Sequence, residues 1–593
     1  GWLAKCLEKV DDLKILYKEN SDAKKLIDAA IHLEGVARHA SVHACGTVIS
    51  KDPLMEHVPL QFAPQDKNIV ITQFEMHSIE DLGLLKIDFL GLKNLTIIEE
   101  TIRLVKELRD EDIKISELPL NDKKTFELLQ RADTTGVFQL EGSGMRHYLK
   151  DLVPTEFEDI VAMISLYRPG TLETGMVPRY IARKHKKEKV TYLYPKLEPI
   201  LKKTYGIMLY QEQLMQVARD LAGFSFSEAD ILRKAVGKKI KSLLLEQEEK
   251  MVKGMMKNEI EKGKAKEIWK WFEPFARYGF NRSHAVCYAL IGYRTAYLKA
   301  HYPEEFMASL FNAELHDIDR IALLVSEARQ KGIEILPPDV NKSSVNFSPE
   351  GRTKIRFGLL AIKNVGEAIV QAVIDERLNR GEFKDLPDFI NRIQHKDLNK
   401  KSLESLIKSG ALDSLGIERK QAFENVDEII RFNSLIKKNG QQTGQSLFGN
   451  APVGLSFKLK PAESATAPEK LGWEKELLGF YLSDHPLNSY KEKIEKLGVL
   501  RIEDARSKDK KDQIVKIAGS VSEIKKILTK NGQPMIFAKI EDFSKESLEV
   551  VVFNDTLLKT MDVWKENNIV AVKGKMSWRN GEPNMVCEKA IKL

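Results

Sequence analysis

A lysine and an aspartate lie two residues apart in the alternating segment Leu85-Lys86-Ile87-Asp88-Phe89-Leu90. Because side chains alternate between the two faces of a strand, Lys86 and Asp88 would share one face. Phosphoryl transfer by two metal ions needs carboxylates that converge on Mg²⁺ and a cation that contacts phosphate. The pair has the residue types for such a site, although an ion pair on a solvated face has the same pattern.

The elements that must position this pair follow from periodicity. Apolar residues recur at helical spacing from Trp2 to about Glu34, whereas 47–49 and 69–72 are short β-branched runs. Helices that lead into a small sheet are therefore expected. Beyond Leu95 the pattern is helical up to about residue 330, which predicts a large, mostly α block.

The last part of the chain shows alternating runs from Val515 onward. Asn531-Gly532 and Asn580-Gly581 interrupt these runs, and Asn-Gly is a strong hairpin signal. A small antiparallel β-barrel is predicted there. Residues 434–470 have the composition of a linker, because they contain few apolar residues at regular spacing.

The composition limits the class of protein. A chain of 593 residues is expected to form several domains of roughly 100–200 residues. Lysine and arginine (93) barely exceed aspartate and glutamate (86), so contact with nucleic acid should be local. The four cysteines form no C-x-x-C pair, which fits the reducing cytoplasm. No apolar run reaches the roughly 18 residues of a membrane span, so no membrane partner is expected.

Six segments resemble the α subunit of bacterial DNA polymerase III, in the order found in that family. The first two resemble the second half of its palm and the other four resemble its fingers. They are Arg38–Ile49, Lys86–Leu92, Thr135–Glu141, Leu166–Gly170, Tyr205–Gln213 and Gly279–Ala285.

The resemblance implies addition of deoxynucleotides to primer-template DNA on a palm similar to that of polymerase β. In the family, three aspartates bind two Mg²⁺ ions, and Asp88 matches the third aspartate. Lys86, Arg233 and Lys234 match residues that contact the deoxynucleoside triphosphate. The family usually has arginine where Lys234 stands, so Lys234 keeps the charge without the bidentate guanidinium group. Neither His43 nor His284 is assigned to a metal.

Two modules are expected to hold DNA. The segment 357–369 has the pattern of a helix-hairpin-helix, in which Asn364 and Gly366 would present backbone N–H groups to a phosphate, and Lys363 beside them is a further expected DNA-binding residue. The C-terminal barrel resembles the oligonucleotide-binding (OB) fold, and the domain as a whole is expected to bind single strands. Residues 330–593 should therefore keep salt-sensitive DNA binding without the palm.

A contact with the sliding clamp is predicted in the linker. Gln445, Leu447 and Phe448 resemble the Gln-x-x-Leu-Phe motif of the family, although Gln445 is one residue too close and Gln442 one too far. The hypothesis is that Leu447 and Phe448 insert into the clamp. A proofreading exonuclease subunit and the clamp loader are the further partners that the resemblance implies.

The expected fold is multidomain α+β, and the chain is expected to lack the family's N-terminal phosphoesterase-like domain, the first half of its palm and its last domain. By itself it would then be inactive. Two other interpretations remain open: a non-catalytic DNA-binding scaffold, and a damage-tolerant homologue. The expected parts are the end of the thumb (1–40), the second half of the palm (41–95), fingers (96–330), helix-hairpin-helix and clamp-binding region (331–433), linker (434–470), helical connector (471–514) and OB domain (515–593).

Overall fold

The computed structural model divides into two compact units, Gly1–Leu92 and Lys93–Leu593, and each unit is described by itself. The residues that the structure describes are 2–36, 39–43, 45–64, 66–238, 241–275, 279–315, 317–441, 459–483, 486–528, 532–543, 547–579 and 582–593. Within these ranges no helix combines the length and the apolar character that crossing a membrane requires.

The first unit begins with the predicted helices and continues into β-structure. Instead of one small sheet, the described residues form two separate two-stranded antiparallel sheets, β1–β4 and β2–β3. Asn20 caps α3 by accepting hydrogen bonds from the amides of Asp22 and Ala23. The elements are α1 (Trp2–Lys9), α2 (Asp11–Glu19), α3 (Ser21–Leu33), β1 (Gly46–Ile49), β2 (Leu60–Phe62), β3 (Val70–Thr72), α4 (Met76–Asp81) and β4 (Leu85–Asp88).

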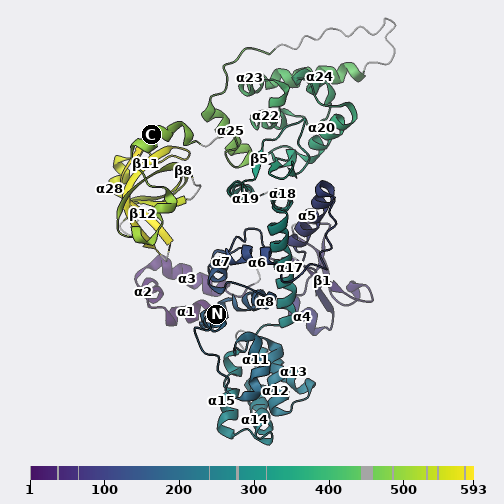
Figure 1. Cartoon of the computed structure of the whole chain (residues 1–593), viewed down its shortest axis with the longest axis vertical. Helices are drawn as coiled ribbons and strands as arrows, with labels where there is room; N and C mark the ends of the chain where they lie inside the picture. Colours follow the sequence, from purple (N-terminus) through teal and green to yellow (C-terminus); the bar gives the residue numbers. More distant parts are fainter. Residues whose placement is uncertain are drawn as a thin grey trace. The chain divides into compact units, whose positions relative to one another are not determined.

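The second unit opens with the predicted helical block (Figure 1). Its long helix α17 packs against α5, α6 and α8. The helices are α5 (Lys93–Arg109), α6 (Lys123–Gln130), α7 (Ser143–Leu152), α8 (Phe157–Leu166), α9 (Pro169–Leu172), α10 (Met176–Lys184), α11 (Glu198–Leu201), α12 (Gln211–Ala222), α13 (Phe226–Lys238), α14 (Lys241–Lys257), α15 (Lys262–Trp269), α16 (Phe272–Phe275), α17 (Arg282–His301), α18 (Pro303–Ala313) and α19 (Ile318–Gln330).

A three-stranded sheet and a second group of helices follow this block. One hydrophobic core runs from Ile97 to Phe480 and joins α18 and α19 to these later elements, so it crosses the boundary expected at residue 330. The elements are β5 (Glu334–Leu336), β6 (Ser348–Pro349), β7 (Lys354–Arg356), the 3₁₀ turn η4 (Leu359–Ala361), α20 (Glu367–Arg380), α21 (Leu386–Arg392), α22 (Lys400–Lys408), α23 (Arg419–Glu424), α24 (Val426–Gln441) and α25 (Ala467–Leu478).

The linker expected at 434–470 is shorter in the structure. Helix α24 continues to Gln441, and α25 already begins at Ala467. Ala465, just before α25, is buried, and its amide donates to Glu418. The first residues of the expected linker are therefore helical. The preceding turns of α24 are anchored by the buried Ile429 and by the buried Asn433, whose side chain donates to the carbonyls of Ile390 and Ile393. The clamp-motif residues Gln445, Leu447 and Phe448 lie outside the described residues.

The C-terminal strands close into a barrel with the order β10-β12-β11-β8-β9. Strands β8–β9 and β11–β12 form the two predicted hairpins. The barrel is not wholly antiparallel as expected, because β10 pairs with β12 in parallel and closes it. The elements, green to yellow in Figure 1, are α26 (Lys491–Lys496), α27 (Ile502–Ala505), β8 (Ile514–Leu528), β9 (Pro534–Glu541), β10 (Ser547–Val552), α28 (Asn554–Lys559), β11 (Ile569–Arg579) and β12 (Glu582–Lys592).

Candidate functional site

Lys86 and Asp88 lie on one face of β4, as the alternation predicts. Their side chains meet with the Lys86 Nζ 2.5 Å from the Asp88 Oδ1. Strand β1 pairs with β4 in antiparallel register, with Val48 opposite Lys86 and Gly46 opposite Asp88. The Lys86 side chain is 13% exposed and that of Asp88 51%, so the carboxylate is the solvent-facing member of the pair.

The hydrogen bond from Lys86 lowers the pKa of the Asp88 carboxyl, and the charges of Lys86 and His43 add to this effect. The carboxylate is thus held ionised at neutral pH. An ionised, solvent-facing oxygen is the form in which a carboxylate binds a cation.

His43 and Cys45 complete a small group around Asp88. Their ligand atoms and that of Asp88 lie within 4.8 Å of one another, and the residues that the structure describes contain no other group of this kind. The His43 Nδ1 accepts a hydrogen bond from the Gly46 amide at 2.7 Å. Gly46 permits this approach, because a Cβ there would lie 2.8 Å from the same nitrogen.

This group fits a magnesium site only in part. Mg²⁺ prefers oxygen ligands in an octahedral arrangement. Asp88 supplies the one carboxylate of the group, Cys45 offers a soft sulfur, and the His43 nitrogen already accepts from Gly46. The described residues around Asp88 therefore provide one ligand residue suited to Mg²⁺ and not a complete site.

Arg233 and Lys234 lie on α13, and both pair with the same acid. An Arg233 guanidinium nitrogen lies 2.8 Å from Asp230 Oδ1, and the Lys234 Nζ lies 2.9 Å from Asp230 Oδ2. Both cations lower the pKa of Asp230, Lys234 first. Asp230 is not among the residues predicted from the sequence, although spacings of three and four residues on a helix indicate such pairs.

Three of the finger-like segments meet in the structure. Glu212 accepts from the Asn281 side chain at 3.0 Å and from the Arg282 amide. The Arg168 guanidinium lies over the Phe280 ring, 4.3 Å from its centroid. Arg233 reaches this cluster through Gln211, since its guanidinium donates to the Gln211 side chain at 3.5 Å.

The segment Thr135–Glu141 has a structural role in this arrangement. Gly136 has φ +75°, and a Cβ there would lie 2.4 Å from a Leu310 methyl, so only glycine fits. The fully buried Lys299 donates to the Thr135 carbonyl at 2.9 Å and pairs with Glu327 at 2.8 Å. Sequence reasoning missed Lys299, whose burial no local pattern reveals.

The predicted helix-hairpin-helix residues form a tight turn before α20. Asn364 has φ +68°, the left-handed region that such a turn needs. Gly366 is the N-cap of α20 with open space where a Cβ would lie. Lys363, Asn364 and Gly366 are all exposed. Before the turn the chain forms the 3₁₀ turn η4 and not an α-helix.

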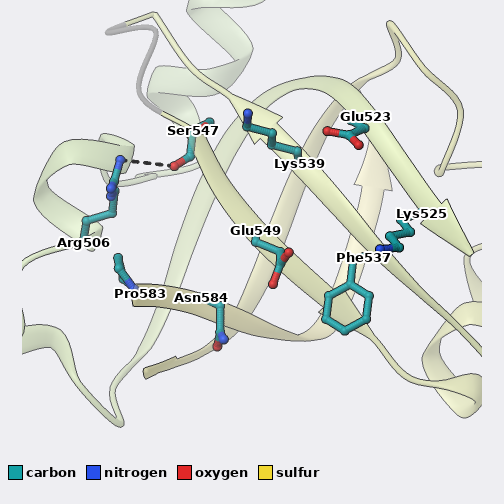
Figure 2. Close-up of a pocket in the computed structure, with 9 residues that line it drawn as sticks. All are labelled: Arg506, Glu523, Lys525, Phe537, Lys539, Ser547, Glu549, Pro583 and Asn584. Carbon is teal, nitrogen blue, oxygen red and sulfur yellow. Dashed lines mark hydrogen bonds between the residues drawn. The ribbon is translucent and has the colours of Figure 1, made fainter. Parts of the chain in front are cut away.

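The barrel carries a cavity of about 410 Å³ on its outer face (Figure 2). Its lining residues are Arg506, Glu523, Lys525, Phe537, Lys539, Ser547, Glu549, Pro583 and Asn584. Among the aromatic residues of the barrel, Phe537 lines this cavity, whereas Trp578 packs against the barrel core. Sequence reasoning did not single out the polar lining residues, although they alternate with apolar ones along the strands.

Four family models match the chain. They are "Bacterial DNA polymerase III alpha NTPase domain" over residues 2–91, "Bacterial DNA polymerase III alpha subunit finger domain" over 94–259, "Helix-hairpin-helix motif" over 332–422 and "OB-fold nucleic acid binding domain" over 515–593. Among solved structures, a mitochondrial single-stranded DNA binding protein from S. cerevisiae matches 14% of this chain and 93% of its own, at 15% identity and a TM-score of 0.13.

Curated relatives match nearly the whole chain and are named DNA polymerase III subunit alpha. The relative from Aquifex aeolicus is 43% identical over 96% of this chain and 47% of its own length. The relative from Borreliella burgdorferi is 41% identical over 99% and 51%, and the one from Escherichia coli 37% over 97% and 50%. The chain spans about half the length of these relatives. It therefore belongs to the family of bacterial DNA polymerase III α subunits.

Proposed function

We propose that this chain contributes to a replicative DNA-directed DNA polymerase, which adds deoxynucleotides to the 3′ end of a primer. The observation that carries the proposal is the Lys86–Asp88 pair, in which strand β4 holds an ionised carboxylate beside a cation. Phosphoryl transfer relies on this combination for positioning and for electrostatic stabilisation. The names of the relatives support the same activity.

In this proposal Asp88 is one of the carboxylates that would hold two Mg²⁺ ions, and these ions would supply charge stabilisation for the transferred phosphoryl group. Lys86 would neutralise charge on the triphosphate, and Arg233 and Lys234 would contact it from α13. A single carboxylate cannot hold two divalent ions about 3.5–4 Å apart. A polypeptide of residues 1–593 alone is therefore proposed to be inactive in primer extension.

The proposed partners are primer-template DNA and deoxynucleoside triphosphates, with single strands bound by the barrel and duplex phosphates by Lys363, Asn364 and Gly366. The sliding clamp, a proofreading exonuclease subunit and the clamp loader remain predicted partners of the complete polymerase. The four cysteines are all free, which suits the cytoplasmic location that we propose.

The test uses Asp88→Asn in a polypeptide that carries the rest of the family's length. We expect primer extension with Mg²⁺ to fall by at least about a thousandfold, because the substitution removes a charged ligand where an ion must bind. Binding of primer-template DNA should stay within about twofold, since phosphate contacts elsewhere supply it. Residues 1–593 alone should show no extension.

Asp81→Asn is the matched control, because Asp81 ends the neighbouring helix α4 outside the Asp88 group. It should leave extension unchanged. Equal loss of extension and DNA binding in Asp88→Asn would indicate a folding role. Unchanged extension would contradict the proposal and favour the DNA-binding scaffold. Extension past damaged template bases would favour the damage-tolerant homologue.

A further inference from the structure

Four adjacent strands place a row of polar side chains across the outer face of the barrel. The register pairs Glu523 of β8 with Lys539 of β9, and Lys539 with Glu549 of β10. Glu549 in turn pairs with Asn584 of β12 across the parallel closure. Direct cross-strand neighbours lie about 4.5–5.5 Å apart between Cβ atoms, so these polar groups form one continuous row.

An aromatic side chain lies in the next row. Phe537 pairs with Lys525 on one side and with Val551 on the other, which places it diagonally beside Glu549. Its neighbours Ile536 and Ala538 are buried in the barrel core, so Phe537 points outward into the cavity. Figure 2 shows the Phe537 ring beneath Glu549 on the strands that line this space. Any base can stack on such a ring, because every base has a π-face.

The charges in the cavity are mixed. Lys525, Lys539 and Arg506 face two carboxylates, Glu523 and Glu549. A groove that tracks the backbone of a single strand is positively charged, because each phosphate is an anion, and it has no use for carboxylates. Two carboxylates disfavour phosphate and instead accept hydrogen bonds. The cavity is therefore suited to a flat ligand that carries hydrogen-bond donors on one edge and an acceptor beside them.

Among the DNA bases, guanine has this edge. Its N1–H and N2–H₂ groups lie side by side and can both donate to one carboxylate, while its O6 accepts from a lysine or an amide. Adenine and cytosine offer one amino group next to a ring acceptor, which a carboxylate repels. Thymine has a single N3–H between two carbonyl oxygens. Single-stranded DNA leaves this edge open to the protein.

We propose that the barrel cavity binds one guanine of single-stranded DNA, stacked on Phe537. Glu549 accepts from N1–H and N2–H₂, and Lys539 or Asn584 donates to O6. The cavity volume of about 410 Å³ leaves room for the base and its sugar. This inference rests on the proposed binding of single strands by the barrel, and it adds a base preference to that binding.

The test measures fluorescence anisotropy of the 593-residue chain with labelled oligothymidines of about 12 nucleotides, a length within the range that OB folds cover. The central position is thymine, guanine, inosine, adenine or cytosine. Guanine should strengthen binding by roughly fivefold or more over thymine, the discrimination of a good bidentate contact. Inosine, which lacks the N2 amino group, should lose much of this gain.

Glu549→Gln should remove the preference for guanine, and affinity for oligothymidine should not fall, because the substitution removes a carboxylate that disfavours phosphate. Phe537→Leu should weaken binding to every oligonucleotide. Glu566→Gln is the matched control, because Glu566 is exposed and lies outside the cavity lining.

Equal affinity of the intact chain for all five oligonucleotides would overturn the inference while leaving single-strand binding in place. Preference for guanine that survives in Glu549→Gln would overturn the assigned contact. Absence of binding to every oligonucleotide would overturn both this inference and the single-strand binding proposed for the barrel. Primer extension is measured separately, so failure of the polymerase proposal is distinguishable from each of these outcomes.

Discussion

At the scale of single residues, the side chains of Arg233 and Lys234 are positioned by neighbours that lie outside the recognised sequence motifs. Asp230 keeps Arg233 and Lys234 on one side of α13, and Gln211 ties Arg233 to the segments around Phe280. Arg233 is 33% exposed and Lys234 58%. The more enclosed guanidinium, with a forked set of donors, is the better candidate for a fixed contact with a triphosphate.

Arg233→Ala should therefore raise the KM for deoxynucleotides in a polypeptide active in extension. Removing a hydrogen bond to a charged group costs about 1.5–3 kcal/mol, which corresponds to a rise of roughly tenfold to a hundredfold. Lys234→Ala, the matched control on the same helix, should raise the KM less. Steady-state kinetics with one varied deoxynucleotide measures both. A lower kcat at unchanged KM in Arg233→Ala would contradict direct binding.

Some side-chain neighbours could be predicted from the sequence and others could not. Lys86 and Asp88 could be placed on one face because strand alternation is local, and the structure confirms it. His43 could not be placed beside Asp88, because β1 and β4 meet only after the chain between them has folded. The same holds for Glu549, whose neighbour Asn584 comes from a strand that pairs across the closure of the barrel.

At the scale of elements, the start of α13 is fixed by one carboxylate. Glu228 accepts from the Ser225 amide at 2.7 Å and from its hydroxyl, and it pairs with Lys250 of α14 at 2.6 Å. These bonds, that of Lys250 first, lower the pKa of Glu228 to about 2. The carboxylate thus ties the helix that carries Arg233 to its neighbour.

Glu228→Gln should lower the thermal midpoint at neutral pH, and the difference from wild type should shrink in acid. The pKa of Glu228 is depressed in the folded state, so its stabilisation is present above 4.5 and disappears as the pH falls toward about 2. Thermal melts between pH 7 and pH 2.5 measure the difference. Glu246→Gln, an exposed control on α14, should show no such trend. A constant difference across this range would contradict the assignment.

Elements were predicted best where their signals are local. Asn-Gly turns marked both hairpins of the barrel, and the flanking strands pair as expected. The parallel pairing of β10 with β12 has no local signal, because register between distant strands depends on the whole barrel. The linker was predicted from its composition to begin at residue 434. In the structure the polar sequence there still forms the last turns of α24, so the predicted start is too early.

At the scale of the whole molecule, the expected boundary at residue 330 cuts through a continuous core. Phe311 of α18 stacks on Phe347 with ring centroids 4.7 Å apart. The Asn312 side chain bonds both the amide and the carbonyl of Phe347. Sequence placed the boundary where helical periodicity stops, but periodicity carries no information on which distant residues pack together. The structure separates Gly1–Leu92 from Lys93–Leu593, close to the boundary expected between residues 95 and 96.

A fragment of residues 331–593 should therefore fold only in part. It lacks Phe306, Phe311 and Leu324, which are fully buried against later elements. Burial of such side chains contributes about 1.5–3 kcal/mol each, and three of them together approach the stability of about 5–15 kcal/mol of a whole domain. Hydrogen exchange should show lost protection in residues 332–430 and native protection in the barrel, whose core is its own.

The control for this truncation is a fragment of residues 93–593, which keeps the whole second unit and should retain native exchange throughout. DNA binding by the shorter fragment would then come from the barrel and should weaken with salt as phosphate contacts require. Native protection of residues 332–430 in the shorter fragment would show that these residues form an independent domain. The core that joins α18 to Phe347 would then be a docking surface between domains and not a shared interior.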